Sequence, residues 1–425
     1  MFMKNAKLCF IDLFAGAGGL SEGFIQSGFN PIAHIEMNAM ACRTLETRSC
    51  YYYLKNEGNL SVYYDYLLGN ITRAEFLDHI PEDVLKTVMP IEISEQTITD
   101  IFDRIDEILD EKGTTQVDVI VGGPPCQAYS LVGRAQSSRM ETPMEKDPRN
   151  NLYLLYARCL ERYRPTMFVF ENVMGIESAN GGRTWTSLQT ELKRVGYDIE
   201  CREQNARDFS VMQDRCRMII IGWKHGSGLH YPNFKPVEIN GTVYELLQDL
   251  PKLTPGQQRN QYRTTCFSRY VKENAIRSQD DVLTLHQSRP HIERDIMIYK
   301  KAIELWEDGQ QRLNYNQLPD ELKTHRNRTS FLDRYKVVGG DLDRCHTILA
   351  HLSKDGHYFI HPDIDQHRSI TVREAARIQS FPDNYFFEGS RTAQFVQVGN
   401  AVPPLMAKGI AAEIYKQLCK KDKNT

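Results

Sequence analysis

The chain has 425 residues, enough for two or three domains that each bury a core of their own. Its 52 Lys and Arg residues are nearly balanced by 55 Asp and Glu residues, which gives a net charge of −3, and its mean hydropathy is −0.48. These values are typical of a soluble protein and exclude a generally basic, histone-like binder of nucleic acid.

Three further features predict a cytoplasmic protein. No apolar run approaches the roughly 18 residues that a membrane span requires. Residues 1–7 lead directly into an apolar segment, without the hydrophobic region of a signal peptide. The ten cysteines are scattered and form no CxxC pair or zinc-type spacing, so we expect most of them to be buried thiols and predict no metal site.

Short apolar runs alternate with helical stretches along the first half of the chain. A helical stretch follows the first run and ends near Gly28, and two others cover residues 98–109 and 152–163. Strands that alternate with helices predict an α/β fold with a parallel, doubly wound sheet of the Rossmann type. The runs typical of strands are residues 8–14, 31–36, 117–121, 167–170 and 218–221.

The second half of the chain is less regular. From about residue 226 to 361 the alternation fades into a segment rich in Gln, Arg, Asn and turn residues. An apolar helix is expected at 403–418, where it could pack back on the first part of the chain. We therefore predict a first domain of residues 1–225 plus 393–425 and a smaller, irregular second domain of residues 226–392.

A glycine-rich turn follows the first predicted strand and opens a helix. It reads Asp12-Leu13-Phe14-Ala15-Gly16-Ala17-Gly18-Gly19-Leu20-Ser21, and in an open α/β sheet a nucleotide-type ligand lies at such a turn. Ser21 stands where the third glycine of G-x-G-x-x-G would be, which favours a ligand without phosphates. Glu36, at the end of the second strand, could accept both hydroxyls of a ribose. Alone, this pattern fits any Rossmann-like site or an ordinary strand-turn-helix.

A cysteine follows the strand at 117–121 in a loop that two prolines stiffen. The loop reads Gly122-Gly123-Pro124-Pro125-Cys126-Gln127-Ala128-Tyr129-Ser130 and holds a thiol at the carboxyl edge of the sheet. A free cysteine has a pKa near 8.5, so Cys126 is already a good nucleophile without a triad.

Polar side chains follow the next two predicted elements at the same edge. The strand at 167–170 runs into Glu171-Asn172-Val173, which places a carboxyl group there. The sequence Gln213-Asp214-Arg215-Cys216-Arg217 then carries two arginines that point the same way if this segment is extended.

These segments, in this order, resemble the cytosine-5 DNA methyltransferases over nearly the whole chain. The turn at 14–19 resembles the S-adenosylmethionine loop of the family, and residues 122–127 resemble its nucleophile loop. Glu171-Asn172-Val173 is similar to the ENV motif and Gln213/Arg215/Arg217 to QxRxR. Residues 345–350 and 358–362 are similar to the end of many target-recognition regions, and residues 373–382 and 397–404 to the last two motifs of the family.

The resemblance implies a Rossmann-like methyltransferase domain at 1–225 plus 393–425 and a target-recognition domain at 226–392. The implied catalytic residues are Cys126, Glu171, Arg215 and Arg217. The implied contacts to S-adenosylmethionine are Phe14, Gly16, Gly18, Gly19, Leu20, Glu36, Met37, Asn70, Pro124, Leu152, Asn400 and Val402, although Leu152 fits core packing as well. Asn70 stands where the family commonly has an aspartate.

The implied chemistry begins with attack of the Cys126 thiolate on C6 of cytosine. A protonated Glu171, its pKa raised by burial, would donate to N3, and Arg215 or Arg217 would bind O2. The resulting enamine takes a methyl group at C5, and loss of the C5 proton releases Cys126.

A base stacked in a duplex cannot reach this edge, so it must be flipped out, and a second surface must hold the DNA. The basic segment 322–336, with a net charge of +4, fits phosphate contact as well as a plain solvated surface. The residues expected to contact double-stranded DNA are Gln127, Ser130, Gln213, Arg326, Arg328, Arg334 and Lys336. We expect a monomer that acts in a restriction-modification system, although no residue identifies a partner endonuclease or the recognition sequence.

Three other functions compete with this interpretation. A branch of the family methylates tRNA, and the catalytic motifs do not separate the two substrates, although a large recognition region favours DNA. A non-catalytic DNA-binding regulator could keep the same fold, but the intact set of Cys126, Glu171 and Arg215 argues against it. An NAD-dependent oxidoreductase would explain only the glycine turn and gives Pro124-Pro125-Cys126 no role.

Overall fold

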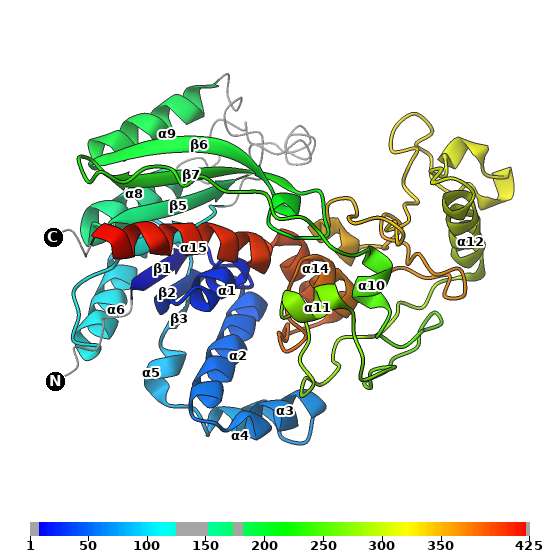
Figure 1. Ribbon diagram of the computed structural model, residues 1–425, viewed down its shortest axis with the longest axis horizontal. Coiled ribbons are helices and arrows are strands. Elements are labelled where there is room, and N and C mark those ends of the chain that lie inside the picture. Colours follow the sequence, from blue (N-terminus) through cyan, green and yellow to red (C-terminus); the bar gives the residue numbers. More distant parts are fainter. Residues whose placement is uncertain (1–7, 125–151, 173–181, 422–425) are drawn as a thin grey trace.

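The computed structural model describes residues 8–124, 152–172 and 182–421 (Figure 1). Its centre is a seven-stranded sheet with the order β3-β2-β1-β4-β5-β7-β6. Strands β1 to β5 are parallel, and β7 is antiparallel to both of its neighbours. The strands are β1 (Cys9–Leu13), β2 (Asn30–Glu36), β3 (Val88–Pro90), β4 (Val119–Gly122), β5 (Met167–Asn172), β6 (Tyr197–Asn205) and β7 (Cys216–Lys224).

The α/β fold is confirmed, but the expectation of an entirely parallel sheet is wrong. Only ten residues connect β6 to β7, and a parallel pair would need a crossover of a dozen or more. The two strands therefore form an antiparallel pair at one edge of the sheet.

Helices cover both faces of the sheet because successive side chains of a strand point to opposite faces. On β1, Ile11 belongs to the core beneath α6 (Ile98–Glu111), α8 (Leu152–Tyr163) and α9 (Arg183–Arg194). Phe10 belongs to the other core, which α1 (Gly19–Gln26) and α15 (Pro404–Lys421) close. Figure 1 shows α15 crossing the sheet beside α1, as the apolar pattern of the last helix predicted.

Close packing of α1 against α15 depends on Gly23. A Cβ atom at this position would lie 2.3 Å from the backbone nitrogen of Lys408, nearer than any real contact. The backbones of α1 and α15 are therefore in close contact at this position.

The chain between β2 and β3 forms a small group of helices below the sheet in Figure 1. Tyr63 and Phe76 lie in an aromatic core of their own there. The helices that lead to β3 are α2 (Ala39–Asn56), α3 (Leu60–Leu68), α4 (Arg73–Leu77) and α5 (Glu82–Leu85).

The remaining chain forms a second lobe with two cores, and helices are few there. One core joins α10 (Val243–Leu247), α11 (Arg269–Glu273), α13 (Val372–Ile378) and α14 (Arg391–Asn400). The other lies beneath α12 (Glu293–Glu307), at the far end of the molecule in Figure 1. The partition at 225/226 and 392/393 stays a prediction. Buried contacts place α14 with the second lobe and α15 with the sheet.

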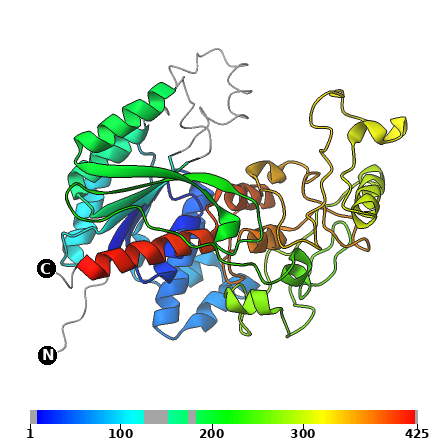
Figure 2. The ribbon, with the colours of Figure 1, turned by 45° about the horizontal axis from the view of Figure 1, so that its top comes forward.

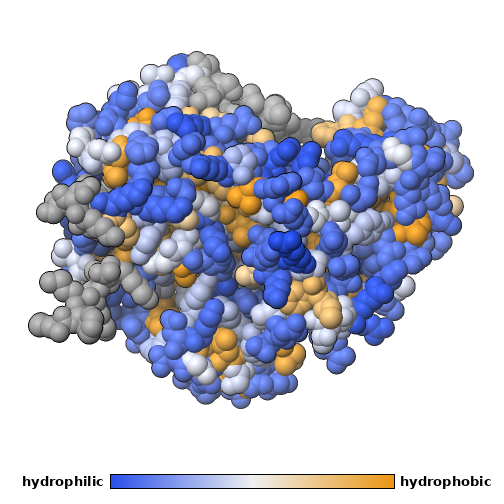
Figure 3. Space-filling view, viewed as in Figure 1, coloured by the Kyte–Doolittle hydropathy of each residue, from blue (hydrophilic) through white to orange (hydrophobic). Residues whose placement is uncertain are grey.

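The short 3-10 helices lie at Ala206–Asp208, Tyr315–Gln317, Asp320–Leu322 and Ala350–Ser353. On the face shown in Figure 3, hydrophobic residues are scattered among hydrophilic ones. Within residues 8–124, 152–172 and 182–421, no helix is both long and apolar enough to cross a membrane.

Candidate functional site at the carboxyl edge of the sheet

The carboxyl ends of β1, β4 and β5 lie side by side. Leu13 is paired with Gly122, and Gly122 with Phe170, so the segments that follow these three strands start at the same level. A Cβ atom on Gly123 would lie 2.8 Å from Oε2 of Glu171, so the carboxylate lies directly against the start of the cysteine loop. The structure thus brings the glycine turn, the start of this loop and Glu171 together.

Some predicted site residues fall outside this description. Cys126, Gln127 and Ser130 lie outside the described residues. Pro124, the last described residue of the loop, is buried.

The glycine turn needs left-handed backbone at three positions. Phe14, Gly16 and Gly18 have φ values of 58°, 54° and 78°, and Gly18 is the N-cap of α1. The amide of Gly18 donates to the carbonyl of Ala15 at 2.9 Å, which closes the turn. A side chain on Gly16 would meet no other atom within 4 Å, so the turn borders open space on that side.

Glu36 is fixed beside this turn by two backbone amides. Its Oε2 accepts from Gly16 N at 2.8 Å and its Oε1 from Asn38 N at 2.7 Å. A carboxylate has about four acceptor positions, so both oxygens can accept a further hydroxyl. Met37, the next residue, leaves 65% of its surface exposed although it is apolar.

This arrangement fits the predicted methyl donor. The open space at Gly16, the oriented carboxylate of Glu36 and the exposed apolar side chain of Met37 match a nucleoside with a ribose diol and a planar base. No pyrophosphate site is needed for such a ligand.

The C-terminal part of the chain closes the other side of the turn. A Cβ atom on Gly19 would lie 2.2 Å from the carbonyl oxygen of Val402, so this contact requires glycine. Asn400 is exposed at the end of α14, two residues earlier. The structure therefore brings Val402 against the turn, with Asn400 two residues before it in the chain.

Leu20 and Leu152 pack in the hydrophobic cores on the two faces of the sheet. Leu20 is buried between the sheet and α15. Leu152, the first residue of α8, packs against the core on the opposite face.

Asn70 is not at the edge of the sheet, and its assignment to the cofactor is not supported. It lies between α3 and α4, and its side chain donates to Asp65 at 2.9 Å. The residues that follow β3 at the edge are Ile91 and Glu92, and the amide of Ile91 donates to the carbonyl of Glu36 at 3.0 Å. A Gly-Asn-Ile match was misleading because an inserted group of helices separates it from β3.

Glu171 and Arg217 form an ion pair at the centre of the edge. Nε of Arg217 lies 2.9 Å from Oε1 of Glu171, and the side chains are only 13% and 16% exposed. Their strands are antiparallel neighbours, with Glu171 opposite Ile219, two residues from Arg217. The pair thus leaves Oε2 of Glu171 beside Gly123, where a substrate base could reach it.

Arg215 does not face the site, which corrects its assignment as a group that binds the base. Its guanidinium is buried and donates to the carbonyls of Ile348, Gly399 and Ala401 at 2.7, 3.2 and 2.9 Å. Arg215 therefore ties the sheet to the second lobe.

Gln213 is likewise buried and cannot contact DNA as predicted. Its amide nitrogen donates to Gln379 at 2.8 Å, and its oxygen accepts from the amide of Ile348 at 2.7 Å. Both ends of the side chain are satisfied within the protein, so its role is structural.

The basic segment 322–336 is divided between structural and free cations. Arg334 is buried and donates to three backbone carbonyls, so its assignment to DNA contact is wrong. Lys336 pairs with Asp333 at 2.7 Å. Arg326 and Arg328 are exposed, and neither forms an ion pair within the described part of the chain.

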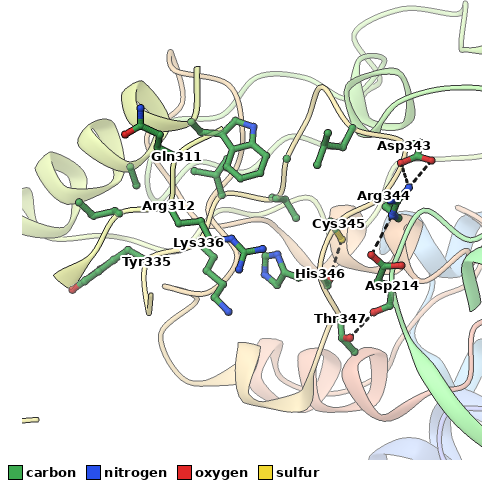
Figure 4. Close-up of a pocket in the computed structure, with 17 residues that line it drawn as sticks. Asp214, Gln311, Arg312, Tyr335, Lys336, Asp343, Arg344, Cys345, His346 and Thr347 are labelled. Atoms are coloured by element: carbon green, nitrogen blue, oxygen red, sulfur yellow. Dashed lines mark hydrogen bonds and ion pairs between the residues drawn. The ribbon is translucent and has the colours of Figure 1, made fainter. Parts of the chain in front are cut away.

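A pocket of about 330 Å³ lies in the second lobe near this segment (Figure 4). Figure 4 shows Arg312 and Lys336 beside His346, while Arg344 turns toward Asp214 and Asp343. Burial, followed by the charges of Lys336 and Arg312, lowers the pKa of His346 to about 4. The wall of this pocket continues into the segment that carries Arg215 and Arg217.

A buried polar group beneath the glycine turn was missed by the sequence analysis. Asp12 on β1 accepts a hydrogen bond from Ser21 on α1, and Oγ of Ser21 lies 3.0 Å from Nδ1 of His34 on β2. Asp12 and His34 are also paired in the sheet. The available signal in the sequence was the presence of three polar residues, Asp12, Ser21 and His34, within otherwise apolar segments of successive elements.

The order of the strands and the reversed β7 define a Rossmann-like methyltransferase fold. A structure described as a DNA modification methyltransferase encoded within a prophage, from E. coli, has a TM-score of 0.64 at 21% identity and covers 97% of this chain and 99% of its own. The Entamoeba histolytica methyltransferase EhMeth has a TM-score of 0.55 at 13% identity, with 97% of this chain and 99% of its own covered. These similarities establish the fold alone.

The family model of the C-5 cytosine-specific DNA methylases matches residues 8–63 and 86–416, and the chain belongs to this family. It is 42% identical to Type II methyltransferase M.Bpa9945I of Bacillus paralicheniformis, over 96% of this chain and 98% of that protein. It is 31% identical to Type II methyltransferase M.DdeI of Desulfomicrobium norvegicum, over 95% of this chain and 88% of that protein. The unmatched residues 64–85 contain Asn70, in agreement with its position away from the site.

Proposed function

We propose that this DNA (cytosine-5-)-methyltransferase modifies one cytosine within a short recognition sequence of double-stranded DNA and takes the methyl group from S-adenosylmethionine. The observation that carries the proposal is the Glu171–Arg217 pair, which lies against the start of the Cys126 loop. Segments at one edge of the sheet would thereby bring a carboxyl group, a guanidinium and the Cys126 thiol to one base.

The cofactor site is the glycine turn. Gly16 would admit the ligand at backbone distance, Gly18 would shape the turn with its left-handed backbone, Glu36 would bind the ribose hydroxyls, and Met37 would cover the adenine. When bound there, S-adenosylmethionine supplies an electrophilic methyl group. Phe14, Gly19, Asn400 and Val402 would complete the walls of this site.

Cys126 would attack C6 of the cytosine as a thiolate, because carbon 5 is a poor nucleophile until that bond has formed. Addition makes C5 an enamine carbon, and elimination of the C5 proton and of Cys126 later restores the aromatic ring. The thiol lies in the loop whose first residues contact Glu171.

Glu171 and Arg217 would act on the polar edge of the same base. Glu171, when protonated, would donate to N3 and accept from the amino group, which makes C6 more electrophilic. Arg217 would bind O2 while its Nε keeps the carboxyl group in place. Because both groups are largely buried, their hydrogen bonds to the base would be made away from bulk water.

A flipped-out cytosine requires that the protein hold the duplex on both sides of the target. Arg326 and Arg328 on the second lobe would contact phosphates, since neither has an acidic partner among the described residues. The type II names of the relatives support a role as the modification enzyme of a restriction-modification system, with a separate endonuclease. We also propose that the enzyme acts as a monomer in the cytoplasm.

The test is transfer of a labelled methyl group from S-adenosylmethionine to duplex DNA and, in parallel, to bulk tRNA. We expect label in DNA only, as 5-methylcytosine within one short sequence that base-resolution sequencing identifies. Label confined to tRNA would overturn the substrate, and binding of the cofactor without transfer to either would overturn the catalytic function.

A further inference from the structure

We propose that the exposed loop of residues 325–332 in the second lobe is a preformed DNA-reading element, in which Phe331 contacts base edges and Arg326 and Arg328 contact phosphates. This inference rests on the proposed modification of double-stranded DNA and adds the residues that select its sequence. Figure 2 shows the yellow part of the chain, which contains this loop, projecting from the second lobe.

Both ends of the 325–332 loop are attached to one buried residue, Tyr315. The amide of Tyr315 donates to the carbonyl of Leu332 at 2.7 Å. Its hydroxyl accepts from the amide of His325, also at 2.7 Å. The loop is therefore closed at its base by a side chain of the core beneath α12.

The interior of the loop is held by Arg334. The guanidinium of this buried arginine lies 4.0 Å from the ring centre of Tyr315. Its Nε donates to the carbonyl of Phe331 at 2.9 Å, and one terminal nitrogen donates to Asn327 and Ser330 at 3.0 and 3.2 Å. Arg334 thus acts as a positioning residue, and the shape of the loop exists before any ligand binds.

Asn327 adds a second set of bonds within the loop. Its Oδ1 accepts from the amides of Thr329 and Ser330, both at 3.0 Å. These bonds lie within the loop, whereas the side chain of Phe331 is exposed.

Phe331 is the most exposed large hydrophobic residue of the described chain, at 67%. Its φ of 55° is unfavourable for a bulky side chain, so the surrounding bonds must impose it. Single exposed hydrophobic residues are common in proteins, but this one is presented by a strained backbone that Arg334 stabilises. A loop ordered in advance loses less entropy on binding, which is useful at a recognition surface.

The charges around Phe331 identify the partner. Lys323 and Lys336 are neutralised by Asp320 and Asp333, at 3.0 and 2.7 Å. Arg326 and Arg328 are exposed and form no ion pair within the described part of the chain. One terminal nitrogen of Arg328 donates to the carbonyl of Lys323 at 3.3 Å, and its guanidinium lies 5.3 Å from the centre of the Tyr315 ring. A duplex groove offers phosphates at its borders and apolar groups such as the thymine methyl on its floor, which matches cations that flank an aromatic side chain.

The experiment measures binding of fluorescein-labelled duplexes in the presence of S-adenosylhomocysteine. The preferred sequence is first selected from a randomised duplex pool by binding to the wild-type protein, so that it does not depend on activity. Affinity is then compared between this duplex and one with the preferred sequence scrambled, and the ratio of the two dissociation constants measures specificity.

We expect F331A to lower the specificity ratio at least tenfold while it changes the affinity for the scrambled duplex less than twofold. The matched control is L68A, which truncates a hydrophobic side chain that is 48% exposed on α3, and it should leave the ratio unchanged. R326A should weaken binding to both duplexes alike and reduce the salt slope by about one.

R334K tests the positioning role, because a lysine cannot bond three carbonyls in this geometry. It should lower the specificity ratio like F331A while the protein stays folded at the assay temperature and its cofactor affinity stays unchanged, and the double variant should be no worse than F331A alone. A specificity ratio within twofold of wild type for F331A overturns the loop proposal. Methyl transfer by the wild-type protein is scored separately, and its absence overturns the proposed function without altering the result of the binding test.

Discussion

Asp12 is the group for which the structure predicts a distinctive dependence of stability on pH. It is fully buried at the end of β1, directly below the glycine turn. One carboxylate oxygen accepts from Ser21, and the other has no hydrogen-bond partner among the described residues. Burial, with a smaller contribution from the negative charge of Glu36, raises the pKa of Asp12 to about 7.

The sign and size of the effect follow from this raised pKa. An unfolded aspartate has a pKa of about 3.9, so between about pH 4 and 7 the folded state holds a proton that the unfolded state has lost. The stability due to protonated Asp12 is therefore complete below about pH 4 and is lost as the pH rises toward 7. Each pH unit in this window lowers the free energy of unfolding by about 1.4 kcal/mol.

The substitution D12N removes this titration and keeps the acceptor for Ser21. Relative to wild type, the variant should gain about 2.5 kcal/mol of unfolding free energy between pH 5 and pH 8, because most of the wild-type loss has occurred by pH 7, where Asp12 is half ionised, and the rest is complete by pH 8. His34, whose pKa burial lowers to about 4, has the opposite effect between about pH 4 and 6.5. It is present in both proteins and cancels in the comparison.

The assay is urea unfolding of the cofactor-free proteins, followed by circular dichroism at pH 5, 6, 7 and 8. The control is D100N, which neutralises an aspartate that is 51% exposed on α6 and pairs with Arg104. Its profile should run parallel to that of wild type. If the difference between D12N and wild type stays constant within about 0.5 kcal/mol from pH 5 to 8, the argument from burial is refuted.

Three further substitutions test the catalytic edge. C126S should abolish methyl transfer and leave cofactor binding intact, and a residual rate above about 5% of wild type would exclude Cys126 as the nucleophile. E171Q should slow transfer by about 100-fold or more in single-turnover measurements while DNA affinity changes little, whereas equal losses would indicate a structural Glu171. G19A should reduce stability by about 1–3 kcal/mol in urea unfolding, because its methyl group would overlap the carbonyl of Val402, and an unchanged midpoint would contradict this contact.

The sequence was sufficient to predict the fold class because the buried parallel strands are continuous apolar runs. The sequence did not predict β3 and β6, the two strands that lack such runs. β3 has three residues, and β6 mixes polar with apolar residues and is mostly only partly buried at the edge of the sheet. The direction of β7 depended on β6, so missing β6 concealed the antiparallel pair.

The sequence correctly predicted that separate motifs lie together, because each of them follows a parallel strand and parallel strands end at the same edge of the sheet. Glu171 and the glycine turn are examples. Burial could not be predicted in the same way. Arg215 and Arg334 are the same residue type as Arg217 and Arg326, and only their contacts with backbone carbonyls, distant in the sequence for Arg215 and within the neighbouring loop for Arg334, make them structural.

The same contacts explain how recognition and chemistry can be coupled in one chain. Gln213 and Arg215 both bond Ile348 of the second lobe, at its amide and its carbonyl, and Arg215 also bonds the carbonyl of Ala401. Arg217 follows two residues later and holds Glu171. A shift of the second lobe against the sheet would therefore strain the segment that positions the Glu171–Arg217 pair. DNA that seats the second lobe correctly would stabilise the geometry of the catalytic edge, because the two surfaces share this short segment of backbone.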